Sequence, residues 1–295
     1  MFRAQELAIF RESRAGREEC KSPPLQPPLF ILVMLPTQRS DLSPSKNRRL
    51  PHRNMAAKAI IGATGAIGSA LSRRLYAKGV TPWLIGRSAE KLQALSSELG
   101  SAPFTVVDFA APEEIGAALK GQLPGGGVDG LAYCVGDIVL KPLKRASPAD
   151  FQNCFNLHVV GAAEAVKAME PALKKSGGGS VVLFSSVAVQ QGFASHAVIS
   201  AAKGAVEGMT RALAAEMAPA IRVNAIAPSI SHSAMATPML GKEAMAAALA
   251  KGHPMQRVGV ADDHAALASF LLTTEESGWI TGQIIGVDGG RAAVA

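Results

Sequence analysis

The chain is poor in cysteine and in aromatic residues: its 295 residues include three Cys, two Tyr and two Trp. Cys20, Cys134 and Cys154 form no CxxC pair and are odd in number, which argues against a disulfide framework and favours a reducing compartment. The longest wholly apolar run near the N-terminus, Leu29 to Leu35, is far shorter than the roughly 20 residues of a membrane-spanning helix. We therefore expect neither a small disulfide-stabilised fold nor a membrane partner.

Most of the chain also has little excess of basic over acidic residues, although the net charge of the whole chain is +7. Residues 1–54 contain ten Lys or Arg against five Asp or Glu, whereas residues 55–295 contain twenty against eighteen. A protein that binds nucleic acid through phosphates needs a clear basic excess. The larger part of the chain has an excess of only two, so we expect no nucleic-acid partner.

Residues 1–54 differ in composition from the rest. They contain the Pro-rich segment KSPPLQPP and the basic segment KNRRLPHR, without helical or strand periodicity, and we predict that they are mostly disordered. One interpretation is a plastid or mitochondrial presequence, against which the acidic residues Glu6, Glu12, Glu18 and Glu19 argue. The other is an upstream extension before a true start at Met55, which predicts a cytoplasmic protein. Both interpretations stay open.

From residue 55 onward, short apolar runs alternate with Ala-rich amphipathic stretches. Strands are predicted at 58–63, 81–85, 104–107, 130–135, 180–184, 221–226 and 283–287. Strands that alternate with helices of this length require right-handed crossovers and a parallel sheet. Residues 55–295 are therefore predicted to form a single doubly wound α/β domain of the Rossmann type, with about seven strands and helices on both faces.

A glycine-rich turn follows the first predicted strand. Gly62, Gly65 and Gly68, with Ala66 and Ile67 between them, stand where the strand ends and a helix begins. Glycines at this point allow the backbone to approach a pyrophosphate and to direct helix N-terminal amides at it. The spacing alone is a weak signal, because a tight turn without a ligand has the same pattern.

Arg87 follows the second predicted strand, in the segment Ile85-Gly86-Arg87. An acidic residue at this point would bind the ribose 2′-hydroxyl of NAD, whereas an arginine can bind a 2′-phosphate. The sequence thus favours NADP(H) over NAD(H). A solvated surface cation is the alternative interpretation of Arg87.

Four segments in the second half of the chain make it resemble the short-chain dehydrogenases/reductases. These segments are Ser185-Ser186-Val187, KGAVE from Lys203, RVNAIAP from Arg222 and ITGQIIGVDGG from Ile280, and the resemblance extends over residues 55–295. It implies that Asp108 and Phe109 border an adenine pocket, that Val135 and Gly136 pass beside the cofactor, and that Pro228 and Ser229 lie near the nicotinamide. It also implies a substrate lid around residues 229–260 and a homodimer or homotetramer.

The chain departs from the family pattern at its catalytic residues. The motif YxxxK has Ile199 in place of its tyrosine, and the helix asparagine corresponds to His158. Tyr76 and Tyr133 are the two tyrosines of the chain, and both precede the fifth predicted strand. In the family this tyrosine supplies the proton for carbonyl reduction, and a general acid of this kind contributes about 10²- to 10⁴-fold in rate.

Several residues are candidates for the remaining catalytic functions. The resemblance implies that Lys203 reaches the nicotinamide ribose and that Ser186 hydrogen-bonds the substrate oxygen. His196 lies two helical turns before Lys203, on the same helix face, and is a candidate acid; a histidine that caps the helix start is the alternative. His158 either replaces the asparagine that anchors a water or bonds to its helix. Tyr133 either faces the cleft or packs.

These residues predict an NADP(H)-dependent oxidoreductase that acts on a small or medium carbonyl or enoyl compound. The alternative is an NAD(P)-binding scaffold or sensor of the same fold without catalysis. No metal site is predicted, because Cys154 and His158, one helical turn apart, provide two ligands where a site needs more. Four methionines in the lid, Met235, Met239, Met245 and Met255, suit either an adaptable apolar pocket or ordinary core packing.

Overall fold

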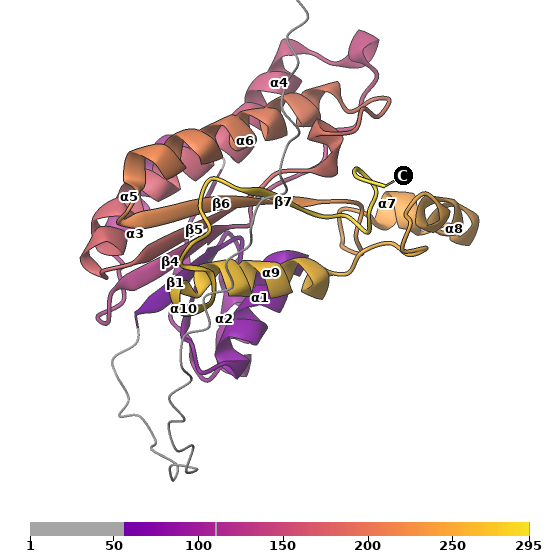
Figure 1. The fold of residues 1–295 in the computed structure, drawn as a ribbon. Helices are drawn as coiled ribbons and strands as arrows, with labels where there is room; N and C mark the ends of the chain where they lie inside the picture. Colours follow the sequence, from indigo (N-terminus) through magenta and orange to yellow (C-terminus); the bar gives the residue numbers. More distant parts are fainter. Residues whose placement is uncertain (1–55, 110, 295) are drawn as a thin grey trace, which may run out of the picture. The chain divides into compact units, whose positions relative to one another are not determined.

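The structure, a computed structural model, describes residues 56–109 and 111–294 (Figure 1). The predictions for residues 1–54 and for a start at Met55 lie outside these ranges. The described residues form one seven-stranded sheet of order β3-β2-β1-β4-β5-β6-β7, in which every pairing is parallel. The strands are β1 (Ala57–Ile61), β2 (Pro82–Gly86), β3 (Phe104–Val106), β4 (Val128–Tyr133), β5 (Gly179–Phe184), β6 (Ile221–Pro228) and β7 (Ile284–Val287).

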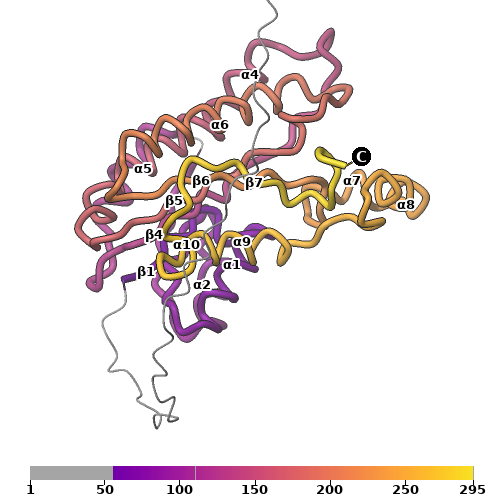
Figure 2. Tube along the Cα trace, viewed as in Figure 1, coloured from indigo at the N-terminus to yellow at the C-terminus, as the bar shows by residue number. Residues whose placement is uncertain are grey.

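Helices cover both faces of the sheet, which confirms the predicted doubly wound α/β fold (Figure 1). One layer consists of α1 (Ala66–Ala77), α2 (Ala89–Glu98), α9 (Ala261–Leu272) and α10 (Thr274–Ser277). The other consists of α3 (Pro112–Lys120), α4 (Pro148–Phe155), α5 (Gly161–Lys175) and α6 (Ala197–Met217). The short helices α7 (Thr237–Leu240) and α8 (Glu243–Lys251) lie beyond the carboxyl ends of the strands, at the right of Figure 2.

The core divides into two apolar layers because successive strand residues point to opposite faces. In β1, Ile61 belongs to the cluster that includes Met169 of α5. The neighbouring Ile60 belongs to the cluster that includes Leu71 of α1 and Leu271 of α9. Since both faces are covered, the strands read as continuous apolar runs, and all residues of β1, β2 and β5 are buried.

The strand order reverses at β1, which has β2 on one side and β4 on the other. In open parallel sheets, a crevice for ligands forms at the carboxyl ends of the strands on either side of such a point. The glycine turn after β1 therefore lies at the expected binding position. No helix in the described part of the chain has the length and apolar character needed to span a bilayer.

Candidate active site

A cavity of about 1130 Å³ lies at the carboxyl ends of the strands. Its walls come from the β1–α1 turn, the ends of β2, β4 and β5, the start of α6 and the segment after β6. Most of the predicted site residues line it together: Gly62, Gly65, Ala66, Ile67, Arg87, Phe109, Val135, Gly136, His158, Ser186, His196, Lys203, Pro228 and Ser229. The fold thus brings residues from the whole length of the domain to one site.

The three glycines of the β1–α1 turn have different roles. Gly62 has a φ of +83°, and a Cβ there would lie 2.9 Å from the backbone carbon of Cys134. A Cβ on Gly68 would overlap the carbonyl oxygen of Gly62, so Gly68 is needed for close packing of helix and turn. Gly65 is exposed, and a Cβ there would have one near neighbour among the described residues, the Gly62 carbonyl oxygen at 3.3 Å. Gly65 thus leaves room for a ligand to approach the backbone.

The helix end behind this turn suits an anion. Helix α1 begins after Gly65, without a side-chain cap and without an acidic residue in its first turn. Its first amides are therefore free of a carboxylate or hydroxyl cap, and the positive end of the helix dipole is uncompensated by its own sequence. A pyrophosphate fits this end of the cavity by charge and by space.

Basic side chains mark the end of the cavity beside β2. Arg87 is exposed directly after β2, and Ser88 and Lys91 line the cavity with it. Ser88 is the N-cap of α2 and accepts a hydrogen bond from the Lys91 amide at 3.3 Å. Phe109 also lines this cavity, whereas Asp108 is exposed after β3 and outside the lining. Ser88 and Lys91 are not among the predicted site residues, although Lys91 is a second cation one helical turn after Arg87.

Lys203 is buried at the centre of the site. Its Nζ donates a hydrogen bond of 2.8 Å to the carbonyl oxygen of Phe184 at the end of β5. Burial lowers the pKa of Lys203 to about 8. The ammonium group thus costs folding free energy at neutral pH, which indicates that its position serves something other than stability.

We predict that replacing Lys203 with methionine changes how stability depends on pH. The folded pKa of about 8 lies below the unfolded value of about 10.4, so the unfolded chain binds more protons between these values. The free energy of unfolding of the wild type should therefore rise relative to that of Lys203→Met by about 3 kcal/mol between pH 8 and 10.4. Urea titrations of both proteins across this range measure the difference, and parallel profiles would contradict it.

Ile199, which was matched from the sequence to the tyrosine of the YxxxK motif, lies one helical turn before Lys203 in α6. It lines the cavity but is 4% exposed, packed in a cluster with Cys154, Val198 and Ala202. A hydrocarbon side chain has no proton to donate. The wall of the cavity beside Lys203 is therefore apolar at the point where the family has a phenol.

Ser186 follows β5 and caps the short 3₁₀ helix Val187–Val189, its Oγ accepting a hydrogen bond of 3.2 Å from the Ala188 amide. The hydroxyl proton remains available for a substrate oxygen, because this bond uses only a lone pair. Ser186 thus lies in the cavity wall with a donor to offer.

His196 lines the same cavity at the start of α6. It is the N-cap residue of this helix, yet its side chain makes no capping hydrogen bond. Instead, Nδ1 lies 2.8 Å from the carbonyl oxygen of Ala194. Because a carbonyl can only accept, Nδ1 carries a hydrogen, which leaves Nε2 as the ring atom that can form a hydrogen bond with a substrate. The geometry suits an imidazole that exchanges a proton with a substrate.

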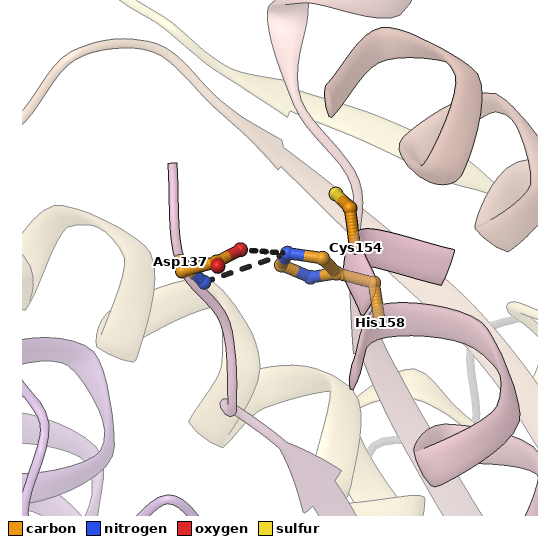
Figure 3. A group of neighbouring side chains, drawn as sticks. All are labelled: Asp137, Cys154 and His158. Carbon is orange, nitrogen blue, oxygen red and sulfur yellow. Dashed lines mark hydrogen bonds and ion pairs between the residues drawn. The ribbon is translucent and has the colours of Figure 1, made fainter. Parts of the chain in front are cut away.

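His158 lies in a π-helical turn, Asn156–Val160, between α4 and α5. Its Nε2 is 2.9 Å from a carboxylate oxygen of Asp137. Figure 3 shows the two side chains pointing toward each other. This hydrogen bond lowers the pKa of Asp137, while burial lowers the pKa of His158. The ring fills the space above Gly136, where a Cβ would lie 2.7 Å from its Cε1. A side chain at position 136 would therefore displace the His158 ring.

Cys154 is close to this pair. The possible ligand atoms of Asp137, Cys154 and His158 lie within 4.8 Å of one another (Figure 3). The pairing of Asp137 with His158 was not predicted, because 21 residues separate them and Asp137 belongs to no recognised motif. The structure thus adds a third possible ligand, Asp137, to the two counted from the sequence, and Nε2 of the imidazole is hydrogen-bonded to the Asp137 carboxylate.

Tyr133 packs rather than facing the cavity. It is 3% exposed, and its hydroxyl donates a hydrogen bond of 2.8 Å to the carbonyl oxygen of Leu157 in the π-helical turn. Burial raises the pKa of its phenol, and its ring meets that of Phe109 edge-on. Tyr133 therefore positions the turn that carries His158 and does not replace the missing tyrosine.

The segment after β6 forms one wall of the cavity. The Ser229 hydroxyl donates to Nε2 of His253 at 2.8 Å, because Nδ1 of His253 donates to the carbonyl oxygen of Leu249. Of the four methionines, Met235 and Met239 line the cavity, and Met235, Met245 and Met255 are exposed. Since they are not core residues, the structure favours the adaptable-pocket interpretation of this segment.

The family model described as "Enoyl-(Acyl carrier protein) reductase" matches residues 62–292, which is most of the chain. The chain belongs to the short-chain dehydrogenase/reductase family. The match includes the glycine turn, the segment around Lys203 and the final VDGG segment, so it extends over the whole described domain apart from its ends.

Two curated relatives and one solved structure illustrate the similarity. The chain is 30% identical over 247 residues to the short-chain reductase protein NovJ of Streptomyces niveus, covering 79% of this chain and 92% of that protein. It is 31% identical over 235 residues to a 3-oxoacyl-[acyl-carrier-protein] reductase of Bos taurus, covering 79% and 96%. A gluconate 5-dehydrogenase from Burkholderia cenocepacia, solved with NADP and tartrate, has a TM-score of 0.76 at 25% identity, covering 82% and 98%. The predicted class, an NAD(P)-dependent oxidoreductase of this family, is confirmed.

Proposed function

We propose that the chain is an NADP(H)-dependent reductase of small or medium carbonyl or enoyl compounds. The observation that carries this proposal is one cavity that joins the glycine turn, Arg87, Lys203 and His196. The residues fit the cofactor: Gly65 gives room at the α1 N-terminus, and Arg87 and Lys91 provide charge for a 2′-phosphate. The bound NADP in the similar gluconate 5-dehydrogenase supports the choice of cofactor class.

When bound, NADPH supplies the hydride that reduces the carbonyl or enoyl group. Lys203 holds a positive charge at the centre of the cavity, where it can bind a ribose hydroxyl. The Ser186 hydroxyl donates a hydrogen bond to the substrate oxygen, on which negative charge develops. The His196 imidazolium then gives its Nε2 proton to that oxygen, so that an N–H bond breaks and an O–H bond forms. His158, held by Asp137, orients the wall beside Gly136.

A second candidate function is an NAD(P)-binding scaffold or sensor without turnover. The apolar environment of Ile199 favours it, because Cys154 and Ala202 surround the side chain where a proton donor stands in the family. The two proposals predict the same affinity for NADPH and differ only in catalysis.

Turnover therefore decides between them. The purified chain is incubated with NADPH and a panel of aldehydes, ketones, enones and enoyl thioesters, and oxidation of NADPH is followed by absorbance. Turnover that is lost in Ser186→Ala supports the reductase. Tight NADPH binding without oxidation across the panel supports the scaffold. If NADPH neither binds nor is oxidised, both proposals are contradicted.

Two broader proposals concern the oligomeric state and the location of the protein. The resemblance to the family implies a homodimer or homotetramer that uses α5 and α6, and we propose this assembly, which sedimentation of the purified chain tests directly. We also propose a cytoplasmic location, which the cysteine content supports, with a plastid or mitochondrial location as the alternative if residues 1–54 are a presequence.

A further inference from the structure

Arg291 lies near the end of the chain, after β7, and reaches back into the cavity. Its guanidinium carbon lies 5.4 Å from the centre of the Phe193 ring, and Nη1 donates a hydrogen bond to the carbonyl oxygen of Gly252. Phe193 precedes α6, and Gly252 follows α8. Arg291 is thus fixed between the segment that carries His196 and the lid, with its remaining N–H groups available.

The position of Arg291 separates it from the cofactor's phosphates. The strands β2, which leads to Arg87, and β7, which leads to Arg291, are five strand spacings apart in the sheet. At about 4.8 Å per spacing this is about 24 Å. Phe193, under Arg291, also lies 5.3 Å from the His196 ring, centre to centre. Arg291 therefore belongs to the substrate end of the cavity.

Charge in the cavity is strongly one-sided. Among its described lining residues, the cations are Arg87, Lys91, Lys203 and Arg291, and the one carboxylate is that of Asp137, which is bonded to His158. The lining also includes apolar side chains, namely Ile138, Leu140, Phe193, Met235, Met239 and Leu249, together with the polar residues Ser231, His232, Ser233 and His253. Because the Arg291 guanidinium is part-buried beside the Phe193 ring, water competes less for its N–H groups than for those of a fully exposed arginine, which strengthens its hydrogen bonds to an anion.

We propose that Arg291 binds a carboxylate on the substrate, so that the substrate class is an apolar oxo or enoyl compound with a free acid group. This proposal rests on the proposed reductase function. The Nη1 bond to Gly252 leaves Nε and Nη2, the edge of the guanidinium that can bind a carboxylate with two parallel hydrogen bonds. Arg291 is thus a specificity-determining residue at the end of the cavity opposite Arg87.

Binding of matched acid and ester probes tests this directly. Straight-chain oxo acids of five to ten carbons and their methyl esters are titrated against the protein, alone and with NADPH, by ligand-observed NMR. In the wild type the best-binding acid should bind about 10- to 100-fold more tightly than its ester, the range expected for hydrogen bonds to a charged group. In Arg291→Met this preference should disappear, and Arg291→Lys should keep part of it, because lysine offers charge without the planar fork.

Arg145→Met is the matched control, since Arg145 is exposed and outside the cavity. It should keep the full preference for the acid. Two results would overturn the proposal: equal binding of acid and ester to the wild type at every chain length, or an equal loss of affinity for both probes in Arg291→Met. Arg291 would then have only the structural role of connecting Phe193 with Gly252. Failure of the reductase function would appear separately, as absence of NADPH binding or oxidation, whatever the acid-to-ester ratio.

Discussion

Replacing His196 with alanine should lower kcat for NADPH-dependent reduction by about 10²- to 10⁴-fold, the usual contribution of a general acid. Nδ1 of His196 donates a hydrogen bond to the Ala194 carbonyl oxygen, so Nε2 is the ring atom that can transfer a proton to a substrate in the cavity. Ile199 offers no proton, and Tyr133 is buried with its hydroxyl bonded to Leu157. The affinity for NADPH should stay within about two-fold, because His196 lies at the substrate end.

Two further variants make this result specific. His196→Gln retains a side-chain donor for the Ala194 carbonyl but has no acidic proton, so it should lose as much activity as the alanine variant. Ile199→Tyr, added to His196→Ala, places a phenol one helical turn from Lys203 and should recover a large part of the lost kcat for carbonyl substrates. Steady-state kinetics on the best substrate of the panel measure all three proteins. Unchanged kcat in both His196 variants would show that another group or water donates the proton.

Replacing Arg87 with aspartate should reverse the cofactor preference. Arg87 is exposed after β2 and lines the cavity with Lys91, where it can pair with a 2′-phosphate. Loss of a charge-assisted hydrogen bond, together with repulsion by the new carboxylate, should raise the Kd for NADPH about 100-fold. The same carboxylate can accept hydrogen bonds from the ribose 2′-hydroxyl of NADH, so the Kd for NADH should stay constant or fall.

Calorimetric titration of each protein with NADPH and NADH gives both constants. Arg145→Asp makes the same charge change at an exposed position outside the cavity and should leave the ratio of the two constants unchanged. Since exposed charges are screened by salt, the titrations are repeated at two ionic strengths. An equal change of both constants in Arg87→Asp would mean that Arg87 does not contact a 2′-phosphate.

The fold could be predicted because local signals agree with the final packing. The buried strands β1, β2 and β5 are continuous apolar runs, and each observed strand end lies within two residues of its predicted position. The predicted glycine turn is also where the structure requires glycine: Gly62 has a positive φ, and Gly68 lies too close to the Gly62 carbonyl oxygen to carry a Cβ. Periodicity and glycine placement are local properties, and no tertiary interaction overrides them here.

The site was only partly predictable, because its details depend on pairs that are distant in sequence. Family motifs located Ser186, Lys203 and His158, but the partner of His158, Asp137, lies in a loop without a motif. Arg291 follows the last motif and meets Phe193 only through the fold. Tyr133 left two interpretations open until its hydroxyl partner was known. Such pairings are set by chain topology, which spacing along the sequence does not encode.

The most direct test of this account is a calorimetric titration of the unmodified protein with NADPH and with NADH. We predict one binding site per chain for each nucleotide and at least about 10-fold tighter binding of NADPH, from the extra charge-assisted contacts at Arg87. Absence of measurable binding for both nucleotides, in a sample that unfolds cooperatively on heating, would contradict the assignment of this cavity to a nicotinamide dinucleotide.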